Sequence, residues 1–141
     1  MYLLDTNVIS EIRKAGDGRA DAQVTAWYAS VDADDAYISV VTVMEIEFGV
    51  IKVEQRDAAQ ALRLRHWLHH HIIPVFDGRV LPIGNATALR CAPLHYPQPR
   101  SWRDSWIAAT ALEHDLTVAT RNVRDFVGTG VAVVDPWEAT P

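Results

Sequence analysis

The chain has 141 residues, of which 49% are hydrophobic, and carries a formal net charge of −5. This length predicts a single domain over residues 1–141, and the negative charge excludes a protein that coats nucleic acid by bulk electrostatic attraction. The apolar runs are far shorter than the roughly 20 residues of a membrane span. The single cysteine, Cys91, excludes an internal disulfide and a cysteine-based zinc site.

The first half of the chain alternates short apolar runs with amphipathic segments. Met1–Asp5 has neither the basic segment nor the apolar core of a secretion signal, so we expect a cytoplasmic protein. Apolar runs predict strands at Tyr2–Leu4 and Ala36–Ser39. Helical spacing of apolar residues predicts helices at Thr6–Lys14, Ala20–Val31, Val41–Val53 and Glu54–His71.

The second half continues the alternation. Ile72–Val75 predicts a third strand, and Pro74 within it indicates an edge position. The remaining predicted elements are helices at Asn85–Leu94 and Ser101–His114, and strands at Leu116–Thr120 and Val131–Val134. Strands that alternate with helices predict an α/β three-layer sandwich around a parallel sheet.

Four acids stand where a predicted strand hands over to a helix, or just inside that helix: Asp5, Glu45, Asp104 and Asp125. The carboxyl ends of parallel strands gather at one edge of the sheet, where ligands bind. Carboxylates brought together there with no basic partner repel one another and require a divalent cation. The pattern therefore predicts a metal-dependent phosphodiesterase.

Each acid also has a structural interpretation. Asp5 is a good helix N-cap, and Asp125 a good turn residue. Glu45 suits a solvated helix face near a helix N-terminus, but its neighbours Val41, Met44 and Phe48 indicate that this face turns inward. The recurrence of acids at strand exits favours the functional interpretation.

Asp104 follows Ser101 at the spacing of a capping box. The capping and catalytic roles are compatible, because a carboxylate at a helix start is expected to have a lowered pKa and to stay ionised for a metal.

Four blocks of the sequence resemble a known family, and they occur in family order across essentially the whole chain: Met1–Ser10, Val43–Gly49, Asp104–Ala111 and Leu116–Phe126. They resemble PIN-domain ribonucleases, particularly the VapC/FitB-type toxins. The resemblance implies a PIN fold with strand order 3-2-1-4-5 and an acidic pocket that binds Mg²⁺ or Mn²⁺.

The resemblance also implies roles for individual residues. Asp5, Glu45 and Asp104 match the first three family acids, with Asp5 and Asp104 as metal ligands. The fourth acid is either Asp125 or the position that Asn122 occupies here. Thr6, Asn7, Thr120 and Asn122 are expected to support the ligands. Arg121 and Arg124 are placed to meet RNA phosphates, with surface ion pairing as the alternative.

The implied function is the toxin of a type II toxin–antitoxin system, a homodimeric Mg²⁺-dependent endoribonuclease acting on tRNA or ribosomal RNA. Water would attack the phosphate in line and leave a 5′-phosphate and a 3′-hydroxyl. A small antitoxin would neutralise the enzyme. The alternatives are a PIN nuclease of RNA maturation without an antitoxin, and a PIN module that binds without cutting.

Two further clusters compete for a functional interpretation. His66 and His70 are one helical turn apart and could hold zinc, but no glutamate stands at H-E-x-x-H spacing, so an exposed helix end is favoured. Trp102 and Trp106 flank Asp104 and fit core packing, a substrate mouth or a protein interface. The family resemblance favours the interface.

Overall fold

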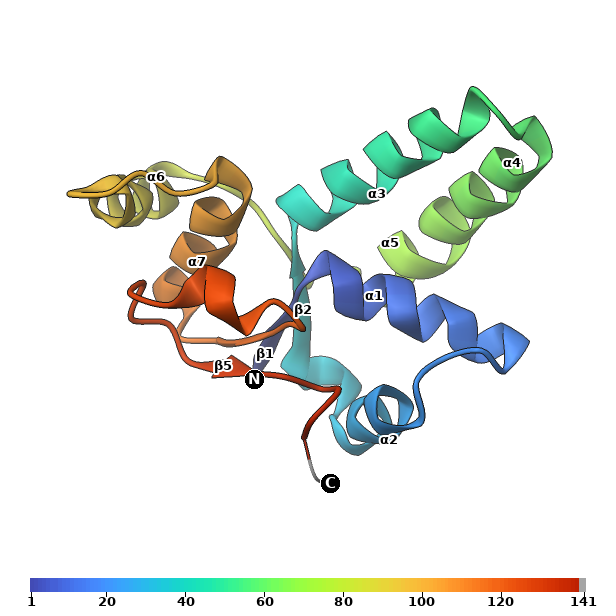
Figure 1. The fold of residues 1–141 in the computed structure, drawn as a ribbon, viewed down its shortest axis with the longest axis horizontal. Helices are drawn as coiled ribbons and strands as arrows, with labels where there is room; N and C mark the ends of the chain where they lie inside the picture. The colour runs from blue at the N-terminus through green and yellow to red at the C-terminus, as the bar shows by residue number, and fades with distance from the viewer. Residues whose placement is uncertain (140–141) are drawn as a thin grey trace.

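The computed structural model describes residues 1–139. Residues 140 and 141, which the predicted domain 1–141 includes, lie outside the described part. A five-stranded, all-parallel sheet has the order β3-β2-β1-β4-β5 (Figure 1), which confirms the predicted topology. Its strands are β1 (Tyr2–Leu4), β2 (Ala36–Ser39), β3 (Val80–Leu81), β4 (Thr117–Ala119) and β5 (Val133–Val134).

Helices connect the strands and cover the sheet on both faces (Figure 1). The α-helices are α1 (Thr6–Arg13), α2 (Ala22–Ser30), α3 (Val40–Glu54), α4 (Ala58–Trp67), α5 (Ile73–Val75), α6 (Asn85–Cys91) and α7 (Trp102–His114). Short 3₁₀ segments are η1 (Lys14–Asp17), η2 (Ala33–Asp35), η4 (Ala92–His95) and η5 (Val123–Phe126). One π-helical segment, η3 (Leu68–Ile72), follows α4.

The central strand β1 divides the core into two clusters. Successive side chains of a strand point to opposite faces, and Leu3 and Leu4 are both buried. Leu4 packs with Val8 and Ile9 of α1 on one face, whereas Leu3 packs with Ile107 of α7 on the other. Each fully buried Leu or Ile contributes about 1.5–3 kcal/mol. This burial fixes α1 and α7 on opposite sides of the same strand.

The predicted strand at Ile72–Val75 is wrong. Ile72 ends the π-helical segment and residues 73–75 form α5, in which Pro74 occupies the first turn, where its missing N–H costs no helix bond. Leu68, Ile72 and Phe76 are buried at helical spacing. The edge strand is instead Val80–Leu81, which is only 2 residues long.

Helices α3 and α4 pack side by side and project beyond the sheet (Figure 1). Arg65 of α4 joins them through ion pairs to Glu54 (2.7 Å) and Glu47 (3.5 Å). Along α3, a row of apolar side chains stays exposed, which we name the α3 stripe: Val40, Met44, Phe48 and Ile51. No helix within residues 1–139 has the length and apolar character needed to cross a membrane.

Candidate active site

Asp5 lies at the carboxyl end of β1 and begins α1. Its Oδ1 accepts a hydrogen bond from the Thr6 backbone N–H (2.7 Å), so Asp5 is the N-cap that its position predicts. Its Oδ2 accepts from the Thr120 hydroxyl (2.7 Å) and from the Asn7 amide (3.5 Å). The Asp5 side chain is completely buried. A buried carboxylate is costly unless donors surround it, and here they do.

Glu45 reaches the same place from α3. Its Oε1 accepts a hydrogen bond from the Thr6 hydroxyl (2.6 Å). On α3, Glu45 follows the buried Thr42 by about one helical turn. The apolar neighbours that indicated an inward face are divided, because Val41 is buried whereas Met44 is 57% exposed and Phe48 is 55% exposed. Glu45 turns toward the sheet edge because polar groups hold it there.

Arg103 is the residue that joins the acids. Its Nη2 donates to Asp5 Oδ1, its Nε to Glu45 Oε2, and its Nη1 to Asp104 Oδ1 (2.5 Å). The expectation of an acidic cluster with no basic partner is therefore wrong. Arg103 is not among the site residues that the sequence predicts. The available signal is an arginine directly before an acid in the first turn of a helix.

The charges in this cluster shift two pKa values. Burial alone would lower the pKa of Arg103, but Asp5 and Glu45 raise it above its ordinary value, so the guanidinium stays charged. For Asp104, burial raises the pKa, Arg103 opposes the rise, and Asp125 and Asp5 add to it. The predicted lowering at the helix start is therefore wrong, although the Ser101 hydroxyl does cap the Asp104 N–H (3.4 Å).

The acids and Arg103 open onto one hollow of about 580 Å³. We name it the acidic hollow, and its lining includes Thr6, Asn7, Glu45, Arg103, Asp104, Arg121, Asn122 and Asp125. Asp5 lies beneath it, in contact with Arg103. The structure thus brings together all four predicted acids, although Asp125 makes no side-chain hydrogen bond to any residue in 1–139.

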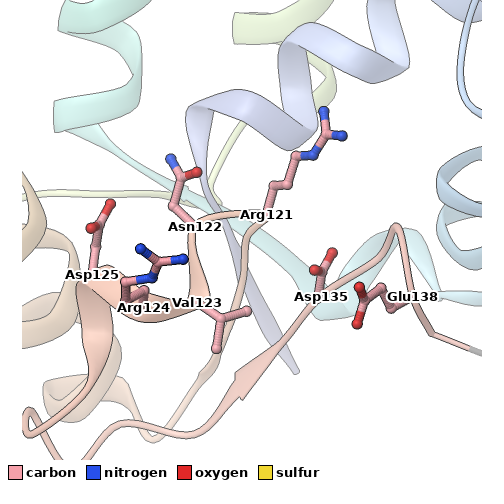
Figure 2. A pocket seen from close by; sticks show the side chains of 7 residues that line it. All are labelled: Arg121, Asn122, Val123, Arg124, Asp125, Asp135 and Glu138. Atoms are coloured by element: carbon pink, nitrogen blue, oxygen red, sulfur yellow. The ribbon is translucent and has the colours of Figure 1, made fainter.

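The loop after β4 forms the open side of the hollow. Its backbone is tied down, since the Asn122 N–H donates to the Thr120 hydroxyl (3.0 Å) and the Arg121 N–H to the Asn7 side chain (3.3 Å). Its side chains are free to solvent, and Figure 2 shows Asn122 and Asp125 extending to the same side of the loop.

Arg121 and Arg124 also project from this loop. Arg121 lies over the Trp137 ring, 5.1 Å from its centroid. Neither arginine forms an ion pair with an acid in residues 1–139. The alternative interpretation of Arg121 and Arg124 as partners in surface ion pairs is therefore not supported. A second hollow of about 660 Å³ continues from the acidic hollow past Arg121 and Arg124 to Asp135 and Glu138 (Figure 2).

The rival clusters carry less chemistry. The rings of His66 and His70 stack at 4.3 Å between centroids. Trp102 is 63% exposed and its ring lies tilted against that of His95, with 4.0 Å between centroids, so core packing does not explain it. Within the described chain, no three acids, histidines or cysteines are arranged to hold a metal in common. At the acidic hollow, the guanidinium of Arg103 lies between the carboxylates.

Comparison with known families decides the fold family. A family model for the PIN domain matches residues 2–129. The chain belongs to the PIN-domain family. This PIN domain is 38% identical to Toxin FitB of Neisseria gonorrhoeae, covering 97% of this chain and 99% of that protein. It is 35% identical to VapC ribonuclease Y4jK of Sinorhizobium fredii, covering 98% and 99%.

Solved structures agree with the sequence relatives. FitAcB from Neisseria gonorrhoeae superposes on this PIN domain with a TM-score of 0.88 and 36% identity, covering 99% of this chain and 100% of that chain. A toxin–antitoxin complex from Klebsiella pneumoniae gives a TM-score of 0.67 and 27% identity, covering 99% and 100%. The predicted resemblance to VapC/FitB-type toxins is confirmed.

Proposed function

We propose that this PIN domain is the toxin of a type II toxin–antitoxin pair and an endoribonuclease that hydrolyses RNA phosphodiester bonds in the cytoplasm, where its substrate is found. The observation that carries the proposal is the convergence of Asp5, Glu45 and Asp104 on one point at the carboxyl edge of the sheet. Asp125 lines the same hollow. Full-length similarity to a toxin and to a ribonuclease adds support.

The donor chemistry of the acidic hollow fits Mg²⁺ or Mn²⁺. The groups that converge there offer oxygen, which hard divalent cations prefer. Three carboxylates share the single positive charge of Arg103, so negative charge remains in excess. In this proposal Asp5 and Asp104 hold the cation, and Glu45 and Asp125 complete the site or hold waters. The cation would supply charge neutralisation at the phosphate and an activated water.

The chain's own residues position the reacting groups. Thr120, Asn7 and the Thr6 N–H fix Asp5, and the Thr6 hydroxyl fixes Glu45. The reaction joins a water oxygen to phosphorus while the bond from phosphorus to the 3′-oxygen breaks. A proton passes from the water to that leaving oxygen, giving a 5′-phosphate and a 3′-hydroxyl.

Arg121 and Arg124 are proposed to contact the phosphates on either side of the cleaved bond. Both are exposed and project from the loop that borders the acidic hollow (Figure 2). A guanidinium binds phosphate through paired hydrogen bonds.

We also propose a cognate antitoxin and a homodimer. The Klebsiella pneumoniae neighbour is a toxin–antitoxin complex, which supports the first partner. The α3 stripe supports the second, because its apolar residues Met44 and Phe48 are each more than half exposed. Light scattering of the purified chain should give twice its mass of 15.7 kDa.

The decisive experiment compares RNA cleavage by the wild type and Asp5→Asn. Asparagine is also a good N-cap, so the variant keeps the α1 cap while losing the charge. We expect Mg²⁺-dependent cleavage that EDTA abolishes, and a loss of more than about 100-fold in the variant, the scale of an essential charge-stabilising group. The matched control is Asp17→Asn, which changes an exposed aspartate on η1.

Three outcomes separate the alternatives. Full activity of Asp5→Asn would refute the site. No cleavage by the wild type, with intact RNA binding, would favour the non-cutting module. Cleavage that no co-expressed neighbouring antitoxin gene suppresses would favour RNA maturation. Mapping of 5′ ends after induced expression, with Asp5→Asn as the reference, would then identify the RNA, with tRNA and ribosomal RNA as the expected classes.

A further inference from the structure

Arg103 lies among the acids of the acidic hollow and pairs with three of them. Three of its nitrogens each donate to a carboxylate from a different element: Asp5 at the end of β1, Glu45 on α3 and Asp104 on α7. One guanidinium therefore holds together side chains that are far apart in the sequence. The Arg103 side chain is 28% exposed, so it also borders solvent.

Arg103 occupies one carboxylate oxygen of Asp5 and one of Glu45, and other groups of the chain engage the second oxygen of each. The other oxygen of Asp5, Oδ2, is engaged by Thr120, and the other oxygen of Glu45, Oε1, is engaged by Thr6. Both oxygens of each carboxylate therefore already have a donor, and Arg103 is the one donor that bonds to both carboxylates within residues 1–139 through its guanidinium, so a cation that bound the pair would compete with it. A divalent cation and a guanidinium in such proximity would also repel each other.

The Arg103 side chain has no other hydrogen bond within residues 1–139. The structure offers a contrast in Arg79 and Arg100. The first donates to the backbone carbonyls of Ala33, Ala36 and Val75, and the second to that of Leu94, so each braces the backbone. The Arg103 side chain binds carboxylates alone, and it lines the acidic hollow of about 580 Å³.

We propose that Arg103 and a divalent cation are alternative occupants of the same carboxylates, so that Arg103 closes the resting site and metal binding requires its withdrawal. This inference rests on the proposed function, because it takes metal binding as given. Its consequence is a weakened affinity for the cation: the free energy of breaking the contacts of Arg103 is subtracted from that of binding the metal.

The test is Mn²⁺ binding to the full chain, measured by calorimetry for the wild type and Arg103→Gln. We expect Kd to fall at least about tenfold, which equals about 1.4 kcal/mol. The matched control is Arg65→Gln, which removes an arginine that also bridges two glutamates, but on the α3–α4 arm. That control should leave the Kd unchanged.

A second measurement follows Arg103 directly. In the wild type, Mg²⁺ should shift the NMR signal of the Arg103 Nε–H, which donates to Glu45. Circular dichroism checks the fold of Arg103→Gln. If that variant does not fold, Arg103→Lys keeps one charge but only one donor group, and its Kd should still fall below that of the wild type.

The outcomes distinguish this inference from the proposed function. Equal or weaker Mn²⁺ binding by the Arg103 variants, with cleavage intact in the wild type, would overturn the inference alone. An unmoved Nε–H signal at saturating Mg²⁺ would do the same. Absence of Mn²⁺ binding and of cleavage in every chain would overturn both proposals.

Discussion

Asp5 lies beneath the acidic hollow and Asp125 lines it, at the exits of two neighbouring strands, but their surroundings differ. Asp5 is fully buried and accepts hydrogen bonds from Thr6, Asn7, Thr120 and Arg103. Asp125 is exposed on a 3₁₀ turn, and no side chain in residues 1–139 donates to it. We refer to these two regions as the β1 corner and the β4 loop.

The difference separates two tasks. A ligand for a small divalent ion must be held in one position, because Mg²⁺ demands strict geometry, and buried donors provide that at the β1 corner. A surface that meets a long and variable polymer gains from exposed side chains on a tethered backbone. Each prediction below either breaks or sharpens this division between a rigid corner and an adaptable loop.

The largest effect is expected from Thr120→Val, which breaks the β1 corner. Thr120 is completely buried and its hydroxyl donates to Asp5 Oδ2. Losing a hydrogen bond to a buried charge should lower the free energy of unfolding by about 2 kcal/mol. That loss corresponds to roughly 8 °C in Tm for a chain of this size, measurable by calorimetry.

The matched control is Thr110→Val. Thr110 is equally buried, but its hydroxyl donates to the Trp106 backbone carbonyl within a helix. It should cost less than about 1 kcal/mol. Equal losses of unfolding free energy in the two variants would mean that the hydrogen bond to Asp5 stabilises the fold no more than an ordinary buried hydroxyl bond does.

A smaller effect is expected at the β4 loop from Arg121→Gln and Arg124→Gln. Each should raise the KM for RNA about three- to tenfold with kcat retained, because a phosphate contact is removed from an exposed position. The dependence of binding on salt should become shallower, by about 0.7 in the log–log slope for each lost contact. Stability should change by no more than about 0.5 kcal/mol.

Arg56→Gln provides the reference for these variants, because it removes an exposed arginine remote from the hollow. A steep loss of stability at Arg121 or Arg124 would contradict the description of an adaptable loop. A KM effect of the same size at Arg56 would show that net charge, rather than position, is responsible.

The smallest effect concerns Asp104 and pH. Burial, with help from Asp125 and Asp5, raises the pKa of Asp104 on folding. A raised pKa stabilises the fold while the carboxyl is protonated, and that contribution disappears as pH rises through the folded-state pKa. Asp104→Asn mimics the protonated form. In EDTA its Tm should exceed that of the wild type at neutral pH by less than about 4 °C.

The two melting temperatures should converge as the pH falls below about 4, where the wild-type carboxyl becomes protonated in the unfolded chain as well. A Tm advantage of Asp104→Asn that increased at acidic pH would contradict this prediction. It would show that Arg103 stabilises the ionised Asp104 carboxylate by more than burial destabilises it.

Much of the fold could be predicted from the sequence. The strands β1, β2 and β4 are buried runs that end at polar residues, and a pattern of burial identifies them within a residue or two. The edge strand β3 could not be predicted, because a strand of 2 residues is too short to show an alternating pattern of apolar and polar residues. Pro74 favoured an edge strand by one rule and the first turn of a helix by another, and packing of Phe76 decided between them.

The candidate active site could be predicted from the sequence only in part. Acids at strand exits can be recognised in the sequence because the topology brings strand ends together, and the structure does bring the side chains of Asp5, Glu45 and Asp104 together. Arg103 was not visible, because a long side chain on a first helical turn can reach solvent or the sheet edge equally well. Only the positions of its three carboxylate partners determine which way it turns.

The order of the strands has a consequence for how the chain reaches this state. The strand that comes first in the sequence lies at the middle of the sheet, and the bond from Thr120 to Asp5 joins residues 115 positions apart. Closing so long a loop is entropically unfavourable and slows folding. During synthesis on a ribosome, β1 cannot pair with β4 until β4 has emerged. Chains that end before β4 would therefore contain Asp5 without the buried hydroxyl of Thr120.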